Sequence, residues 1–138
     1  MKMAQSETQE TAVVDVLAPI AVDTLYSYRV PHGLALEPGD SVTIPLGVRE
    51  AYGVVWDCRT APLQAAGDLK SVSTRLDRPR LSQQLRDFID WLARYTLTPR
   101  GMALRLATRA AEDAAPDALR TLYRVTGAPV RRLSLIHI

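Results

Sequence analysis

Several residue types that would mark other classes of protein are scarce in this sequence of 138 residues. The single cysteine, Cys58, excludes an internal disulfide and favours a reducing compartment. The two histidines, His32 and His137, are far apart, so no spacing of metal ligands is recognisable. A phosphate-binding loop of the form GxxxxGK(S/T) has no match. We therefore expect no cofactor, metal site or nucleotide site.

Long apolar runs are missing as well. No stretch approaches the roughly 18 apolar residues that a helix needs to cross a bilayer. The first residues, MKMAQSETQETA, are polar and contain no hydrophobic segment of the kind found in secretory signals. We expect a cytoplasmic protein without membrane contact.

The clearest pattern that is present is a β-hairpin between residues 36 and 56. The proline and glycine of residues 38–40 predict a turn. Val42 and Ile44 then alternate with polar residues, which is the period of a half-buried strand. Gly47 lets the chain return through a loop of about five or six residues into a second strand. Shorter strands are predicted at residues 12–17, 25–30 and 69–75, and short strands of this kind are typical of a small barrel.

A helix follows the strands. Ser82 can cap its first turn. Apolar residues then recur at i, i+3, i+4 and i+7, namely Leu85, Phe88, Ile89 and Leu92. Trp91 and Tyr95 widen that apolar face, and a second, shorter helix is predicted at residues 99–108. The predicted fold is therefore of the α+β class, a small β-barrel with a C-terminal amphipathic helix packed on it.

The composition divides the chain into three parts. Residues 1–11 are polar and are expected to form a disordered tail. Residues 12–109 are expected to form the barrel domain with its helices. Residues 110–138 are interpreted as a linker and the truncated start of a winged-helix domain. The last six residues, LSLIHI, differ abruptly from what precedes them and are interpreted as a non-native scar.

Charge is distributed unevenly along the domain. Residues 13–69 hold three arginines and seven acids, a net charge of −4, whereas residues 70–109 hold nine bases and three acids, a net charge of +6. The second half can therefore meet an anionic partner. A solvated, arginine-rich face explains the same numbers, and composition alone favours that second interpretation.

Few residues in the sequence suggest catalysis. Cys58 could be combined with His32, but it directly follows an apolar strand and is interpreted as an inert structural cysteine. No base accompanies Ser27. Among the aromatic residues, Tyr26 can stack on a nucleic-acid base, while Tyr28 and Trp56 are interpreted as core residues. Lys70 is one of two lysines in the sequence, a weak signal by itself.

Several segments together resemble a known family. They include YSYRVPHG at residues 26–33, GDSVTIPLG at residues 39–47, LKSV at residues 69–72 and WLARY at residues 91–95. Their order and spacing resemble the N-terminal part of primosomal protein N′, the bacterial replication-restart helicases often called PriA, over about residues 13–109. The resemblance implies a β-barrel domain that binds the 3′ end of single-stranded DNA, the nascent leading strand at a stalled fork. It implies other primosome proteins and single-strand-binding proteins as further partners.

The resemblance also implies which residues form the 3′-end site. The family's aromatic residue falls on Tyr26, its turn glycine on Gly47 and its lysine on Lys70. An acidic residue of the family falls on Ser27, which keeps a hydrogen-bonding group but loses the negative charge. From the sequence, the protein is expected to tolerate a 3′-phosphate better than a Ser27→Asp variant would. Helicase activity, ATP and zinc belong to regions of the family that these residues do not include, so we expect no enzyme activity in this chain.

Two other functions stay open at this point. A small barrel can bind RNA or other proteins, since this fold serves many functions. RNA binding as tight as DNA binding, without dependence on the 3′ end, would favour the first. A protein-interaction module using Trp56 and the helix surfaces would be favoured by a basic surface far from Tyr26 and Ser27.

Overall fold

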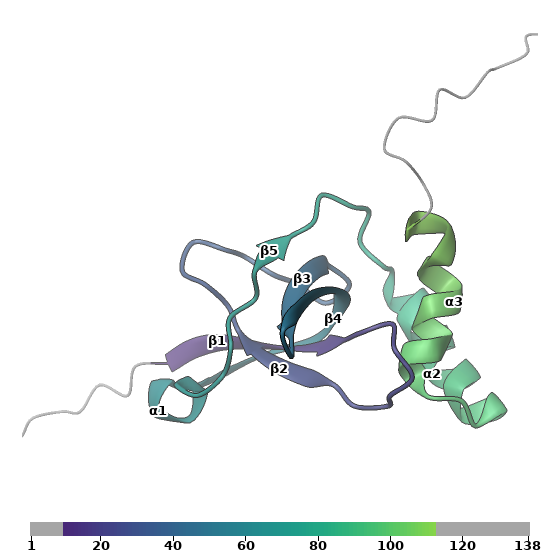
Figure 1. Ribbon diagram of the computed structural model, residues 1–138, viewed down its shortest axis with the longest axis horizontal. Coiled ribbons are helices and arrows are strands. Elements are labelled where there is room, and N and C mark those ends of the chain that lie inside the picture. The colour runs from purple at the N-terminus through teal and green to yellow at the C-terminus, as the bar shows by residue number, and fades with distance from the viewer. Residues whose placement is uncertain (1–9, 113–138) are drawn as a thin grey trace, which may run out of the picture.

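The computed structural model describes residues 10–112 of the chain, which form a five-stranded antiparallel sheet and three helices (Figure 1). In chain order the elements are β1 (Glu10–Leu17), β2 (Tyr26–Arg29), β3 (Ser41–Leu46), β4 (Arg49–Pro62), α1 (Leu63–Ala66), β5 (Thr74–Arg75), α2 (Gln83–Thr96) and α3 (Arg100–Glu112). The predicted α+β class is confirmed.

The long strand β4 connects the two parts of the sheet, whose strand order is β2-β1-β4-β3-β5. Its first half pairs with β3 and its second half pairs with β1, and Val54 lies opposite a residue of each. The predicted hairpin is therefore confirmed, but the predicted length of its loop is wrong. Leu46 pairs directly with Arg49, because Gly47 adopts a φ of 64°, as a two-residue hairpin loop requires.

The closed barrel is not confirmed. At one edge of the sheet, β5 pairs with β3 through only two residues, which shortens the strand predicted at residues 69–75. Just before β5, Ser71 forms an isolated parallel bridge with Arg29 at the end of β2. The Arg29 N–H donates to the Lys70 carbonyl at 2.9 Å, and the Val72 N–H donates to the Arg29 carbonyl at 3.0 Å. The two edges of the sheet thus approach each other at this bridge without forming a ladder.

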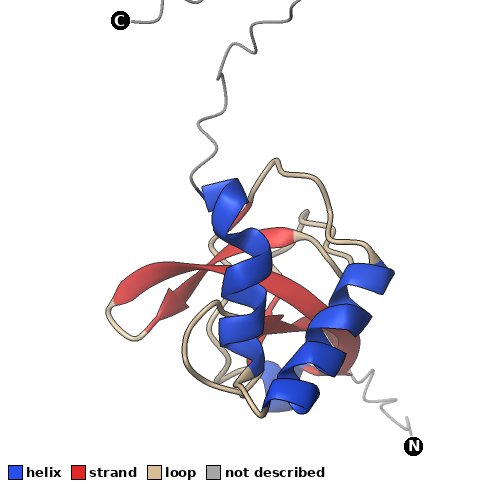
Figure 2. Ribbon diagram, turned by 90° about the vertical axis from the view of Figure 1, so that its right-hand side faces the viewer, coloured by secondary structure: helices blue, strands red, loops and turns tan. Residues whose placement is uncertain are grey.

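Two hydrophobic cores lie on opposite faces of the sheet. The first consists of side chains from the strands, and its buried members include Val14, Val16, Tyr28, Val42, Ile44, Val55 and Val72. The second lies between the sheet and the pair of helices α2 and α3, with Leu17, Val54, Ile89, Ala93, Ala103 and Leu104 buried in it. Figure 2 shows α2 and α3 side by side over this face. The sheet is thus covered by helices on one face and curls around its own side chains on the other.

The start of α2 follows the prediction. The Ser82 hydroxyl accepts a hydrogen bond from the Leu85 N–H at 3.2 Å, and the helix ends at Leu97, whose φ is 52°. In α3, Gly101 lies against the loop between β1 and β2. A β-carbon there would clash with the carbonyl oxygens of Ala18 and Ile20, so the close approach of α3 to this loop requires glycine.

The apolar face of α2 is narrower than predicted. Ile89 and Ala93 are buried, but Phe88, Trp91 and Tyr95 are 51%, 52% and 75% exposed. The three exposed rings stack in sequence, with centroids 5.8 Å and then 5.1 Å apart. The prediction failed because α2 packs against the sheet and α3 along the line of Ile89 and Ala93, and the aromatic residues lie off that line.

The ends of the described region also differ from the prediction. β1 begins at Glu10, within the stretch assigned to the N-terminal tail, and α3 continues to Glu112, past the predicted start of the linker. The remaining expectations for residues 1–9 and 113–138, including the winged-helix start and the LSLIHI scar, lie outside the described residues. Within residues 10–112, no helix has the length and apolar character that crossing a membrane requires.

Candidate nucleic-acid interface

The two tyrosines of β2 lie on the curled face of the sheet. Side chains alternate along a strand, so Tyr26 and Tyr28 share a face. Tyr28 is 4% exposed and its hydroxyl donates to the Pro45 carbonyl at 3.1 Å, which confirms it as a core residue. Tyr26 packs against the same core but is only partly buried. Part of the Tyr26 side chain is therefore left open to a ligand. Burial, and secondarily the neighbouring Tyr26, raise the pKa of Tyr28.

Gly47 and Lys70 are brought into direct contact. The Lys70 ammonium donates to the Gly47 carbonyl at 3.3 Å across 23 positions of sequence. Lys70 is held there by its own carbonyl, which accepts from the Arg29 N–H at the end of β2. Gly47 is exposed, and no atom lies within 4 Å of the place where its β-carbon would be. The backbone of the hairpin loop is thus accessible beside a cation.

Tyr26 lies on the same face of β2 as Tyr28, whose hydroxyl reaches the end of β3. Pro45, which accepts the Tyr28 hydroxyl, lies two residues before Gly47 at the end of β3. Gly47 and Lys70 therefore meet near the Arg29 end of β2, and Tyr26 borders the same curled face at the other end of that strand.

Ser27 is placed differently. Its side chain points to the opposite face of β2, where it is paired in register with Asp15 of β1. The Ser27 hydroxyl donates to Asp15 Oδ1 at 2.5 Å and accepts from Arg59 Nη2 at 3.0 Å. Arg59 also forms an ion pair with Asp15 at 3.3 Å. The structure thus groups Ser27 with Asp15 and Arg59, and we call these three residues the Asp15 cluster.

The electrostatics of the Asp15 cluster favour a charged carboxylate. Burial raises the pKa of Asp15, but the hydrogen bonds from Ser27 and Arg59 and the charge of Arg59 lower that pKa by more. Sequence reasoning missed Asp15 and Arg59. Alternation along β1 could have assigned Asp15 to the face away from Val14 and Val16, but only the strand register brings it to Ser27.

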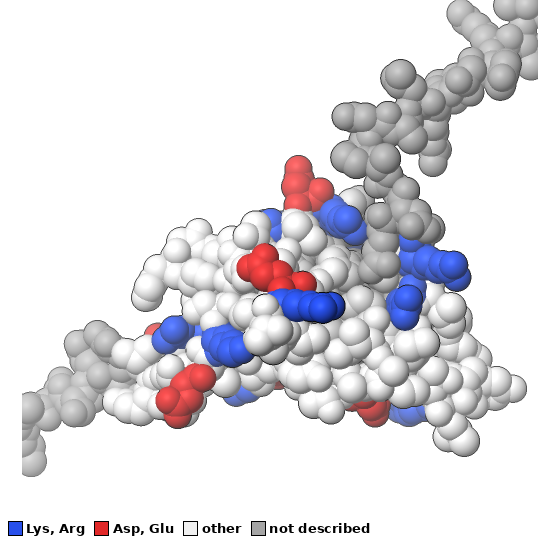
Figure 3. Space-filling view, in the orientation of Figure 1, with Lys and Arg blue, Asp and Glu red and all other residues white. Residues whose placement is uncertain are grey.

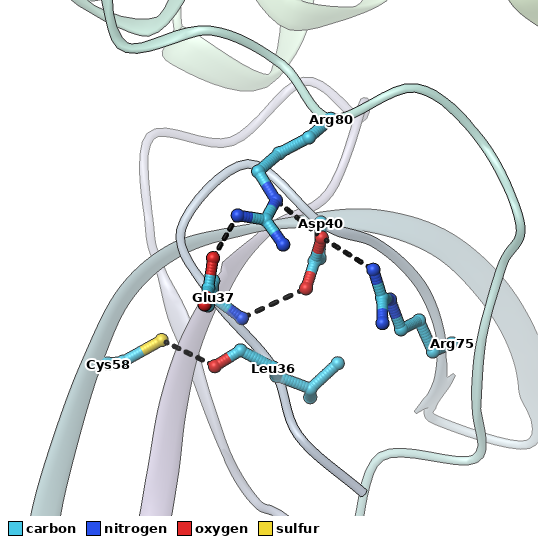
Figure 4. Close-up of polar contacts among 6 residues, drawn as sticks. All are labelled: Leu36, Glu37, Asp40, Cys58, Arg75 and Arg80. Atoms are coloured by element: carbon cyan, nitrogen blue, oxygen red, sulfur yellow. Dashed lines mark hydrogen bonds and ion pairs between the residues drawn. The ribbon is translucent and has the colours of Figure 1, made fainter.

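Three of the nine basic residues in residues 70–109 form ion pairs within the described part of the chain. Arg75 and Arg80 form ion pairs with Asp40 at 3.4 Å and 2.9 Å, and Arg80 also pairs with Glu37 (Figure 4). Arg100 pairs with Asp23 at 3.0 Å. Figure 3 shows basic and acidic side chains interleaved on this view of the molecule. Lys70 makes no ion pair within residues 10–112, and the same holds for Arg78, Arg86, Arg94 and Arg105.

A hollow of about 710 Å³ lies elsewhere, between the β1–β2 loop and the turn that joins α2 to α3. Its lining includes Asp23, Asp90, Arg94, Leu97 and Arg100 and none of the four predicted site residues. Nearby, Trp56 is partly buried against the second core and its indole N–H donates to Asp90 Oδ2 at 3.3 Å. Trp56 is therefore a packing residue, as predicted.

The described residues hold little that resembles a reaction centre. No group of three or more metal-binding side chains occurs among them. Cys58 is exposed, but its thiol is 3.6 Å from the Leu36 carbonyl (Figure 4). Burial, and then Asp57, Asp40 and Glu37, raise the pKa of Cys58, which disfavours the reactive thiolate.

Comparison with known proteins identifies the class. Residues 15–109 match the model of a 3′ DNA-binding domain, so the chain is of a DNA-binding class. It belongs to the family of PriA 3′ DNA-binding domains, which confirms the resemblance found in the sequence. A stretch of 95 residues, 68% of the chain, is 28% identical to the replication restart protein PriA of Rickettsia felis. The match spans 14% of the length of that relative.

Proposed function

We propose that this chain binds the 3′ end of single-stranded DNA, as on the nascent leading strand of a stalled replication fork, and that it does so without catalysing a reaction. The observation that carries the proposal is the contact between Lys70 and Gly47, within a chain of the PriA 3′ DNA-binding family. The similarity to the replication restart protein PriA of Rickettsia felis supports the wider role.

Each residue of the site has a distinct task. The partly open ring of Tyr26 stacks on the terminal base. The free space in front of Gly47 lets the backbone approach the terminal nucleotide. The Lys70 ammonium, already directed at this loop, meets a backbone phosphate. Because one cation contacts few phosphates, binding is weak and depends on salt.

The outer edge of β2 is open along part of its length within residues 10–112. Beyond the bridge at Arg29 and Ser71, β2 has no partner on its outer side within the described residues. The bridge supports the interpretation of the sheet as a small, partly open barrel whose opening lies at Tyr26 and Ser27. The terminal nucleotide is proposed to lie at this opening.

A competition assay tests this function. A labelled single-stranded oligonucleotide with a free 3′-hydroxyl is displaced by the same unlabelled strand, by its circular form and by RNA of equal sequence. We expect the circle to compete about tenfold more weakly, because it cannot place a terminal base on Tyr26 and one stack is worth about 1–3 kcal/mol. Equal competition by the linear and the circular oligonucleotide would refute end recognition. Equal competition by RNA and DNA would point to an RNA-binding module.

A further inference from the structure

The outer side of α2 carries a row of aromatic rings, formed by Phe88, Trp91 and Tyr95, which are 51%, 52% and 75% exposed and stack on one another. At 3.6 residues per turn, the row lies on the side of α2 opposite Ile89 and Ala93, the residues by which the helix packs on the second core. No other described element lies over this side of α2 (Figure 2). The row is therefore a surface patch, and it is separated by the sheet from the face on which Tyr26 lies.

The aromatic row is large enough to be the central patch of an interface. A buried aromatic side chain removes about 150–250 Å² from water, so the exposed parts of the three rings together offer roughly 350 Å². Exposed patches of this size often mark a place where another macromolecule binds. A standard-size interface buries about 800 Å² on each partner. The row alone therefore suits a partner that binds weakly and that also contacts residues beside the row.

Two charges of opposite sign lie along one flank of the row. Asp87 lies one turn before Trp91 and Arg94 lies one turn after it, on the same flank of α2. Both residues are exposed, and neither makes an ion pair within residues 10–112. The Arg94 Nε donates to the Asp90 carbonyl of its own helix at 3.2 Å, which does not neutralise the charge. An acid and a base are thus presented beside the rings, each without an opposite charge.

This arrangement is complementary to itself when a second α2 runs antiparallel to the first. A two-fold axis across the helices at Trp91 sets the residues before Trp91 on one copy against the residues after it on the other, and it keeps each flank against the same flank. Asp87 of each copy then faces Arg94 of the other, and Phe88 of each faces Tyr95 of the other. The two Trp91 rings meet at the centre. A parallel pair would instead set the charged flank against the aromatic flank.

We propose that the chain associates with a second copy of itself through this face, as a two-fold dimer with antiparallel α2 helices. Charge complementarity argues for a second copy, because the acid and the base occupy symmetric positions about the central ring. Since the apolar patch is smaller than a standard-size interface, the dimer is weak and forms at high protein concentration. The association does not require the 3′-end function.

Sedimentation velocity of the full chain at concentrations from about 1 to 500 μM measures this association. The parent should shift from monomer toward dimer across the range. Trp91→Ser should raise the dissociation constant at least about tenfold, because the central ring is lost from both copies. Val48→Ser is the matched control, since Val48 is an exposed apolar residue in the β3–β4 loop, and it should leave the constant within about twofold.

Charge reversal tests the antiparallel arrangement. Asp87→Arg sets two bases against each other and Arg94→Asp sets two acids against each other, so each variant alone should associate severalfold more weakly than the parent. An equal mixture of the two variants should associate about as tightly as the parent, because every base then faces an acid of the other copy. Both positions are exposed, so the variants should fold, and their melting curves check this.

Three results would overturn the proposal. A chain that stays monomeric at the highest concentration would leave the aromatic row to a different partner. A dimer that Trp91→Ser does not weaken would have its interface elsewhere. If each charge variant associates weakly and their mixture does so as well, the two copies do not pair in the antiparallel arrangement. Binding of DNA is measured separately, so its failure would refute the 3′-end function and leave the dimer standing.

Discussion

Lys70 and the arginines around Asp40 lie in the same basic half of the sequence but have different surroundings. Asp40 is 2% exposed, pairs with Arg75 and Arg80, and also accepts the Glu37 N–H at 2.9 Å (Figure 4). Lys70 is exposed, and its ammonium contacts only a carbonyl oxygen among the described residues. A count of charges along the chain therefore overstates the charge that a ligand meets, because part of it stabilises the turn that precedes β3.

The largest expected effect is on stability. Asp40→Ala should lower the free energy of unfolding by about 2–4 kcal/mol, because it removes a buried acceptor, leaves Arg75 and the Glu37 N–H without their partner and leaves Arg80 with Glu37 alone. Chemical denaturation measures the change. Glu37→Ala, which removes an exposed partner of Arg80, should cost less than about 1 kcal/mol. Equal losses of unfolding free energy would show that Asp40 stabilises the fold no more than an exposed acidic residue does.

Tyr26→Ala should produce the largest loss of binding. Truncating the ring removes one base stack and should weaken end binding by about 1–3 kcal/mol. Tyr28→Phe is the control, since it keeps the packing of the ring and loses only the hydrogen bond to Pro45. Anisotropy titrations with a 3′-hydroxyl oligonucleotide measure both variants. Unchanged affinity of Tyr26→Ala would place the terminal base elsewhere.

Lys70→Ala should have a smaller effect, visible in the salt dependence. Loss of one phosphate contact should reduce the slope of log K against log salt by about 0.7. Arg105→Ala removes the same charge from the exposed side of α3, away from the site, and should leave the slope unchanged. If the two variants lower the slope equally, binding does not depend on the position of Lys70, and unpaired arginines elsewhere contribute as much.

The smallest effect concerns pH. The pKa of Asp15 is lowered in the folded state, so its interactions stabilise the fold above the ordinary aspartate pKa of about 4 and this contribution is lost as the pH falls below it. The stability difference between the parent and Arg59→Gln should therefore be present at pH 7 and shrink toward pH 3. Denaturation midpoints across this range measure it. A difference that stays constant with pH would mean that Arg59 stabilises the fold without Asp15.

The sequence predicted local features better than contacts between strands. The β3–β4 hairpin and the cap of α2 depend on residues near one another, such as Gly47 and Ser82, and both were predicted. The bond between Ser27 and Asp15 depends on which residue of β1 lies opposite β2, and a pattern of alternation does not fix that register. The exposure of Trp91 and Tyr95 likewise depends on where α3 packs against α2. The contact between Lys70 and Gly47 required the bridge at Arg29 and Ser71.

The same difference explains why the four site residues could be named but not arranged. The resemblance identified four residues as members of the site, namely Tyr26, Ser27, Gly47 and Lys70. Membership of the family is confirmed over residues 15–109. Alternation along residues 25–30 placed Ser27 on the face opposite Tyr26, and the strand register then brought it to Asp15. Their roles in binding stay a proposal.

The central claim is that a DNA 3′ end lies where β2, the β3–β4 loop and residues 70–72 meet. The most direct measurement is an NMR titration of the backbone amides with a trinucleotide that carries a free 3′-hydroxyl. We expect the largest shifts at Tyr26, Ser27, Gly47 and Lys70, with small shifts around the hollow between the β1–β2 loop and the α2–α3 turn. Shifts confined to Arg94, Leu97 and Arg100, with none at the four residues, would contradict the claim.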